Sequence, residues 1–153
     1  MIKNTLAKKS NDVTDVASCT CTNIRKAARI VTQAYNDALR PVDLRSTQFT
    51  LLANLTRKGD TPLTQLAEAM VMDRTTLTRN LKPLERRQLI HIGHEKDQRV
   101  RKIGITPAGK QIFEDALPLW QEMQKQIAQG MGQQRWSDFM NDLSETVSIV
   151  QDG

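Results

Sequence analysis

Apolar positions in the first part of the chain recur at steps of three and four residues. Such a stripe is formed by Ile24, Ala27, Ala28, Val31, Ala34, Tyr35 and Ala38. This period is typical of a helix that buries one face. The helix should end near Arg40, because Pro41 disfavours helical backbone in the residue before it. Residues 1–12 are polar and lack this period, which predicts a flexible N-terminal arm.

Three shorter helical patterns follow in the middle of the chain. The first should begin at Ser46 or Thr47, both good N-caps, and end at Gly59. Residues 60–62 have the composition of a loop, with a second short helix over 63–70. The third helix, 74–87, follows a very short link and is capped by an aspartate at 73. A proline at 83 predicts a kink or a tightened last turn in that helix.

After residue 87 the apolar period changes from about 3.6 to 2. Ile90 and Ile92 alternate with polar or small residues, as do Ile103 and Ile105, and a charged segment lies between them. This pattern predicts a β-hairpin. Two further amphipathic helices follow the start signal Thr106-Pro107. The fold class is therefore mainly α with a small β-hairpin wing, a winged helix-turn-helix embedded in a helical dimerisation frame.

The element order predicts three kinds of segment. Residues 1–12 are the arm, residues 13–45 and 107–153 form a helical dimerisation region, and residues 46–106 form a winged helix-turn-helix DNA-binding domain. The outer helices carry apolar stripes that one small hairpin cannot cover, so a two-fold homodimer is expected. The alternative is that the stripes pack within one chain. Trp120 and Trp136 are interpreted as core or interface residues, in preference to residues that stack on a ligand.

The charge of the chain favours a polyanionic partner. The net charge is +5, and residues 74–102 hold nine positive against three negative side chains. A merely solvated face is the alternative interpretation. No apolar run reaches the ~18 residues of a membrane span, and no secretion signal is visible, so a cytoplasmic protein without a membrane partner is expected. No catalytic motif is found, so we predict that the chain is not an enzyme and needs no cofactor.

The helix over 74–87 has the properties of a major-groove reader, with an apolar inner face and a polar outer face. The predicted DNA-contacting residues are Thr64, Arg74, Thr75, Thr76, Thr78, Arg79, Lys82, Arg86, Lys96, Asp97, Arg99 and Arg101. Thr75, Thr76 and Arg79 are expected to reach base edges. Further along the helix, Lys82, Arg86 and Arg87 are expected to meet phosphates. A winged helix used only for protein contacts is the rival interpretation, but this helix lacks an apolar outer patch.

Several spaced motifs together resemble the multiple antibiotic resistance regulator (MarR) family. They are Leu66-Ala67, the segment 73–79, Leu84-Glu85-Arg86-Arg87, Asp97-Gln98-Arg99 and the segment 105–109. The resemblance implies a homodimer on a palindromic double-stranded DNA operator, usually a repressor released by a ligand or by oxidation. It also implies that Arg99 is the wing arginine, oriented by Asp97. Gln98 and Gln88 depart from the family, which often has arginine and glycine there.

The regulatory site is less well defined by the sequence. By resemblance, a small aromatic ligand would bind near Arg25, Arg29 and Tyr35. Cys19 and Cys21 lie near the start of the first helix, where a lowered thiol pKa is reasonable. They are interpreted as redox residues, packing residues or, least favoured, metal ligands. Residues two apart on a helix point about 200° apart, which argues against a disulfide within one chain. No metal site is predicted.

Overall fold

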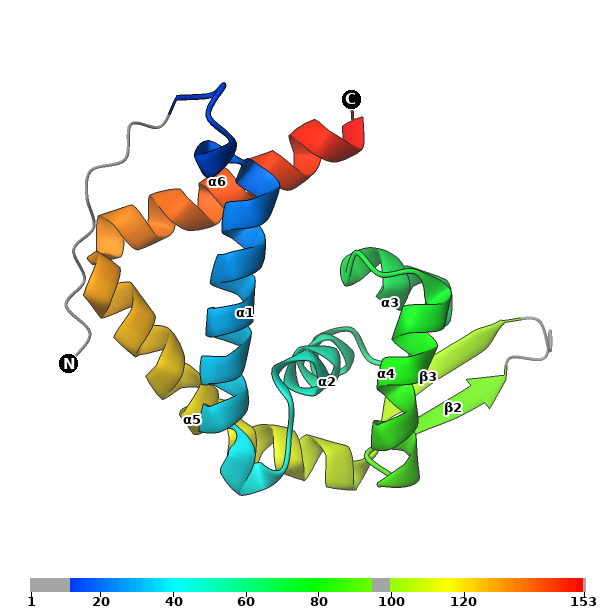
Figure 1. Ribbon diagram of the computed structural model, residues 1–153. Coiled ribbons are helices and arrows are strands. Elements are labelled where there is room, and N and C mark those ends of the chain that lie inside the picture. Colours follow the sequence, from blue (N-terminus) through cyan, green and yellow to red (C-terminus); the bar gives the residue numbers. More distant parts are fainter. Residues whose placement is uncertain (1–11, 95–99, 153) are drawn as a thin grey trace. The chain divides into compact units, whose positions relative to one another are not determined.

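The computed structural model describes residues 12–94 and 100–152 of the chain. Its elements, in chain order, are η1 (Val16–Ser18), α1 (Thr20–Ala38), η2 (Arg40–Val42), α2 (Ser46–Lys58), β1 (Thr61–Pro62), α3 (Leu63–Ala69), α4 (Arg74–Arg86), β2 (Ile90–His94), β3 (Arg101–Ile105), α5 (Pro107–Met131) and α6 (Gln133–Asp152). Figure 1 shows that helices dominate and that the sheet is small. The predicted fold class is confirmed.

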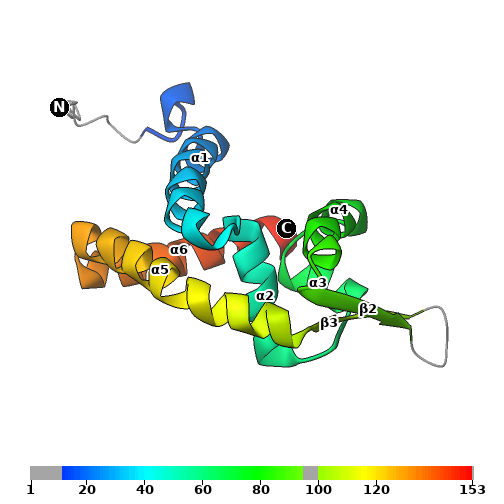
Figure 2. The ribbon, with the colours of Figure 1, turned by 90° about the horizontal axis from the view of Figure 1, so that it is seen from below.

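The chain divides into two compact units. The first, Met1–Ala34, contains η1 and most of α1, and the second, Tyr35–Gly153, contains every later element. Within the second unit, α3 and α4 pack against each other, and they contact β3 and β2 respectively (Figure 2). The helices α2 and α5 also pack together there. Over the described residues, none of the helices combines the length and the apolar character that crossing a membrane requires.

The sheet has one more strand than the sequence predicted. Its order is β1-β3-β2 and every pairing is antiparallel, with Ile90 opposite Ile105 and Thr61 opposite Ile103. The prediction that residues 60–62 form only a loop was wrong, because Thr61 and Pro62 pair with β3. A strand of two residues is too short to show an alternating pattern.

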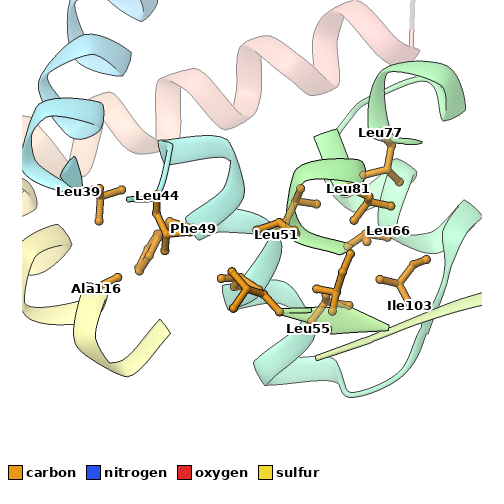
Figure 3. Packing of buried hydrophobic residues seen from close by; sticks show 14 of the residues in the cluster. Leu39, Leu44, Phe49, Leu51, Leu55, Leu66, Leu77, Leu81, Ile103 and Ala116 are labelled. Atoms are coloured by element: carbon orange, nitrogen blue, oxygen red, sulfur yellow. The ribbon is translucent and has the colours of Figure 1, made fainter. Parts of the chain in front are cut away.

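The core of the second unit lies between α2, α3, α4 and the sheet. Leucines from each of these helices, together with Ile103, are excluded from solvent (Figure 3). Near the N-terminal end of α2, the ring of Phe49 stacks on Phe113 and Trp120, with centroid distances of 5.3 and 5.5 Å. Trp120 is therefore a packing residue, as predicted. This contact attaches α5 to the helix-turn-helix part of the fold.

Some helix boundaries differ from the predicted ones. The N-cap of α2 is Arg45, so neither Ser46 nor Thr47 caps it. The Ser46 N–H instead donates to Asn36 Oδ1 at 2.8 Å, a partner ten residues away that no local pattern reveals. The helix α4 ends at Arg86 and continues through Pro83 without a break.

Candidate nucleic-acid interface

The start of α4 is fixed by its N-cap. The carboxylate of Asp73 accepts hydrogen bonds from the backbone N–H of Thr76 at 2.8 Å and from its hydroxyl at 2.7 Å. These bonds, the hydroxyl first, lower the pKa of Asp73 from its usual value. The cap predicted from the sequence is therefore present, and it places the first turn of α4 in a defined position.

The end of α4 has the hydrogen bonds of a Schellman motif. Gln88 has a φ of 55°, and its N–H donates to the carbonyl of Glu85 at 2.8 Å. The N–H of Leu89 donates to the carbonyl of Leu84 at 2.9 Å, and both leucines are buried. Position 88, where the family often has glycine, thus has a left-handed backbone conformation, and a glutamine occupies it.

The turn between α3 and α4 has the same motif. Val71 has a φ of 50°, and its N–H donates to the Glu68 carbonyl at 3.0 Å. The N–H of Met72 donates to the Ala67 carbonyl at 2.9 Å. A β-branched residue is uncommon at a positive φ. Val71 adopts this conformation because burying the apolar faces of α3 and α4 fixes the course of the backbone between the two helices.

Five polar residues of α4 surround a shallow hollow of about 420 Å³ on the surface, namely Arg74, Thr75, Thr78, Arg79 and Lys82. Arg74, Arg79, Lys82 and, beyond the hollow, Arg86 are exposed. Across residues 12–94 and 100–152, the structure shows no ion pair that involves these four cations. Their positive charge is therefore available to an external anion.

The three threonines at the start of α4 differ in their hydrogen bonds. The hydroxyl of Thr76 donates to Asp73, and that of Thr78 donates to the carbonyl of Arg74 at 2.7 Å. Thr75 is exposed, and in the described part of the chain its hydroxyl has no hydrogen-bond partner. Of the three side chains, Thr75 thus has the hydroxyl best placed to meet a base edge.

Arg87, which the sequence predicts to meet a phosphate, has a partner within the protein. Its Nη1 donates to the backbone carbonyl of Asp43 and lies 3.7 Å from the Asp43 carboxylate. The guanidinium is therefore already used inside the protein. A partner 44 residues earlier in the chain cannot be found from local pattern.

The remaining predicted DNA contacts lie on α3 and on the wing. Thr64 is exposed on α3, and Arg101 is exposed on β3. Arg101 also lines a cavity of about 280 Å³ between α4 and the sheet, together with Lys82 and Glu85. Lys96, Asp97 and Arg99 lie outside the described residues. Their predicted contacts with DNA therefore stay predictions.

Cys19 lies immediately before α1 and not on it, which corrects the interpretation of both cysteines as helical neighbours. Its carbonyl accepts the N–H of Asn23 at 3.0 Å, which is the first bond of the helix. The angle of about 200° between helical neighbours consequently does not apply to this pair. Hydrogen bonds from Thr22, first from its side chain and then from its backbone, lower the pKa of the Cys19 thiol. Both thiols are free, and Cys21 is exposed.

The residues expected to bind a ligand fall in both units of the chain. Arg25 and Arg29 are exposed on α1 in the first unit, whereas Tyr35 belongs to the second. Tyr35 is half-buried, which raises its pKa, and its hydroxyl donates to Gln124 of α5. Their combination into one site stays a prediction. Among the described residues, no three His, Cys, Asp or Glu side chains are grouped as metal ligands would be.

Comparison with known proteins agrees with this geometry. The MarR family model matches residues 44–100, the segment that contains α2 to β2. The transcriptional regulator MosR of Mycobacterium tuberculosis, solved in complex with DNA, is 33% identical, with a TM-score of 0.81. That match covers 88% of this chain and 97% of MosR.

Two further similarities are more distant. BpsR of Bordetella bronchiseptica, whose DNA binding is regulated by 6-hydroxynicotinic acid, is 19% identical with a TM-score of 0.79. The match covers 87% of this chain and 96% of BpsR, and it shows a shared fold. An uncharacterised helix-turn-helix regulator of Bacillus subtilis, YhbI, is 29% identical over 86 residues, which is 56% of this chain and 56% of that protein.

Proposed function

Because the chain belongs to the MarR family of transcriptional regulators, we propose that it is a homodimeric, sequence-specific DNA-binding repressor and not an enzyme. It binds a palindromic operator on double-stranded DNA in the cytoplasm. The observation that carries this proposal is the outer face of α4. Exposed cations, which have no acidic partner among the described residues, surround the open hydroxyl of Thr75 there. A capped helix with such a face suits the major groove.

The exposed side chains of α4 divide into two roles. Thr75 and Arg79 lie in the first half of the helix and would contact base edges, where arginine can bond guanine at two points. Lys82 and Arg86 lie in the second half and would contact phosphates. Thr64 on α3, Arg101 on β3 and the wing residues Lys96, Asp97 and Arg99 would add contacts with the backbone or the minor groove.

A comparison of two variants tests this division. Arg79→Ala should weaken binding to the operator more than binding to random DNA, by about 1–3 kcal/mol of discrimination. Lys82→Ala should weaken both alike and lower the salt slope of binding by about one. Equal losses on both DNAs for Arg79→Ala would show that it contacts only phosphate.

The homodimer is supported by the apolar faces of the outer helices. Neither α1 nor α6, each described over its full length, contains a buried residue. The side chain of Ile30 is 74% exposed and that of Val150 is 76% exposed. Amphipathic helices gain most of their stability by packing an apolar face. A second copy of the chain supplies that packing and places two reading helices one DNA turn apart.

The signal that releases the DNA is proposed to be a small aromatic acid, with Arg25, Arg29 and Tyr35 as the residues that bind it. The regulation of BpsR by 6-hydroxynicotinic acid supports a ligand of this class. The two arginines would pair with the carboxylate. Isothermal titration with salicylate as the probe tests the idea, since Arg29→Ala should weaken its binding. Equal binding by the wild type and this variant would contradict it.

The alternative signal is oxidation of a thiol. It is favoured by the hydrogen bonds from Thr22, which stabilise the thiolate of Cys19. In that case a hydroperoxide should abolish operator binding, a thiol reductant should restore it, and Cys19→Ser should remain bound. Operator binding that is indifferent to the oxidant would contradict a redox role for both cysteines.

A further inference from the structure

Arg87, the C-cap of α4, differs from the exposed cations of that helix because its guanidinium donates a hydrogen bond within the protein. The Nη1 atom donates to the carbonyl oxygen of Asp43 and lies 3.7 Å from Asp43 Oδ2. The Arg87 side chain is 31% exposed, whereas that of Asp43 is 94% exposed. A carboxylate in open solvent contributes little to a pair at this distance. The charge-assisted bond to the carbonyl is therefore the main interaction.

The carbonyl of Asp43 is a fixed acceptor. Asp43 has a φ of 52°, and its N–H donates to the carbonyl of Arg40 at 3.0 Å. On either side of it, Leu39 is fully buried and Leu44 is 3% exposed. The turn that follows η2 is thus anchored in the core at both ends. It also lies next to α5, because η2 packs against that helix.

The backbone around Arg87 is equally constrained. Arg87 is the C-cap of α4, and the Schellman bonds of Gln88 and Leu89 follow it directly. The carbonyl of Leu89 accepts the N–H of Thr106, the residue that caps α5. Arg87 therefore stands where the turn after η2, the end of α4 and the start of α5 come together.

We propose that Arg87 is a positioning residue for DNA recognition, which holds the C-terminal end of α4 against the turn after η2 and so sets the angle of the reading helix. This inference rests on the proposed DNA-binding function. Thr75 lies about 18 Å along the helix from Arg87 at 1.5 Å per residue. A tilt of about 5° at Arg87 would therefore move Thr75 by about 1.5 Å, more than a base contact tolerates.

The test compares Arg87→Ala with Arg86→Ala, a neighbouring exposed arginine as the matched control. Arg87→Ala should lower operator affinity about tenfold, the effect of losing one good base contact. It should leave random-DNA affinity and the salt slope unchanged, because no phosphate contact is lost. Arg86→Ala should lower the salt slope by about one. A slope reduced equally by Arg87→Ala would overturn the proposal.

A second readout does not depend on DNA. Arg87→Ala should lower the midpoint of thermal unfolding and Arg86→Ala should not, because only Arg87 has a partner within the described chain. If the wild type shows no preference for its operator, the proposed function fails, while the unfolding midpoints still decide whether the contact with Asp43 matters. Equal unfolding midpoints for the two variants would overturn the positioning role proposed for Arg87.

Two conservative variants identify the atoms involved. Arg87→Lys retains a cationic nitrogen that can donate to the carbonyl, so it should recover part of the affinity lost in Arg87→Ala. It is also the variant to use if Arg87→Ala does not fold. Asp43→Asn keeps the carbonyl and tolerates a positive φ, so it should bind the operator within about twofold of the wild type. A tenfold loss in Asp43→Asn would contradict the role given to the carbonyl.

Discussion

In the part of the chain that the structure describes, three residues with side chains occupy left-handed backbone positions where glycine is more usual. They are Asp43, Val71 and Gln88, and each lies in a turn that directs a helix of the second unit. In the two Schellman motifs, the positive φ at Val71 and Gln88 lets the following N–H reach back to a helix carbonyl. The geometry is thus imposed by the packing of the helices, and the residue present bears a local conformational cost.

Replacing Gln88 with glycine should stabilise the protein. The side chain of Gln88 is exposed, so its removal costs little packing. Relief of the strain at φ 55° should raise the free energy of unfolding by about 1 kcal/mol. Urea unfolding followed by circular dichroism measures this, with Gln88→Ala as the control that retains a Cβ. A glycine variant that is no more stable than the alanine variant would contradict the backbone strain inferred at Gln88.

Thr75 and Thr78 provide a matched pair for base recognition. Thr75→Val removes an open hydroxyl at nearly constant shape, so we expect about a tenfold loss of operator affinity. The donor of Thr78 is already satisfied by the carbonyl of Arg74, so Thr78→Val should change affinity less than Thr75→Val. Fluorescence anisotropy with labelled operator DNA measures both. The reverse order of effects would show that the hydroxyl of Thr78 is the one that reads DNA.

Among the elements, the start of α5 packs closely against the turn at the end of α4. The hydroxyl of Thr106 donates to the carbonyl of Gln88 at 2.7 Å and accepts the N–H of Gly109 at 3.0 Å. A Cβ placed on Gly109 would come within 2.0 Å of the Leu89 carbonyl oxygen. Helix α5 therefore approaches the end of the Schellman turn so closely that only glycine fits there.

Substitution of Gly109 should be far more harmful than substitution of another glycine of the same helix. Gly109→Ala should lower the free energy of unfolding by about 1–3 kcal/mol through overpacking. Gly130→Ala, where an added Cβ meets nothing within 4 Å, should be neutral or raise it by about 0.5–1 kcal/mol. Thermal unfolding of the two variants compares them. Equal stability would mean that the junction can adjust.

The elements show which features can be predicted from sequence. The periods of 3.6 and 2 follow from local burial, so they predict the helices and the hairpin strands. The caps at Asp73 and Thr106 are predicted from their residue types. The strand β1 has two residues and no period. The partner of Arg87 lies 44 residues away, and the constraint on Gly109 comes from Leu89. Such features depend on tertiary contacts, which no local pattern encodes.

As a whole molecule, the protein is proposed to act together with a second copy of the chain. The apolar stripe of α6 includes Val147, which is 45% exposed, and Val150. Val147→Glu should shift the solution mass from twice 17.3 kDa toward 17.3 kDa, because a buried unpaired charge disfavours the interface. Ser148→Glu, at an exposed polar position, should remain a dimer. Light scattering coupled to size-exclusion chromatography measures the solution mass of both variants. If both have the mass of a dimer, this stripe is not part of the interface.

Sequence-specific DNA binding can be measured by a fluorescence anisotropy titration of the protein on two duplexes at the same salt concentration. One is DNA from upstream of its own gene, and the other is a scrambled duplex of equal length. We predict binding at least about 10³-fold tighter to the upstream DNA, with two chains on each duplex. Equal affinity for the two duplexes would show that α4 contacts phosphates without reading bases, and it would contradict the proposed function.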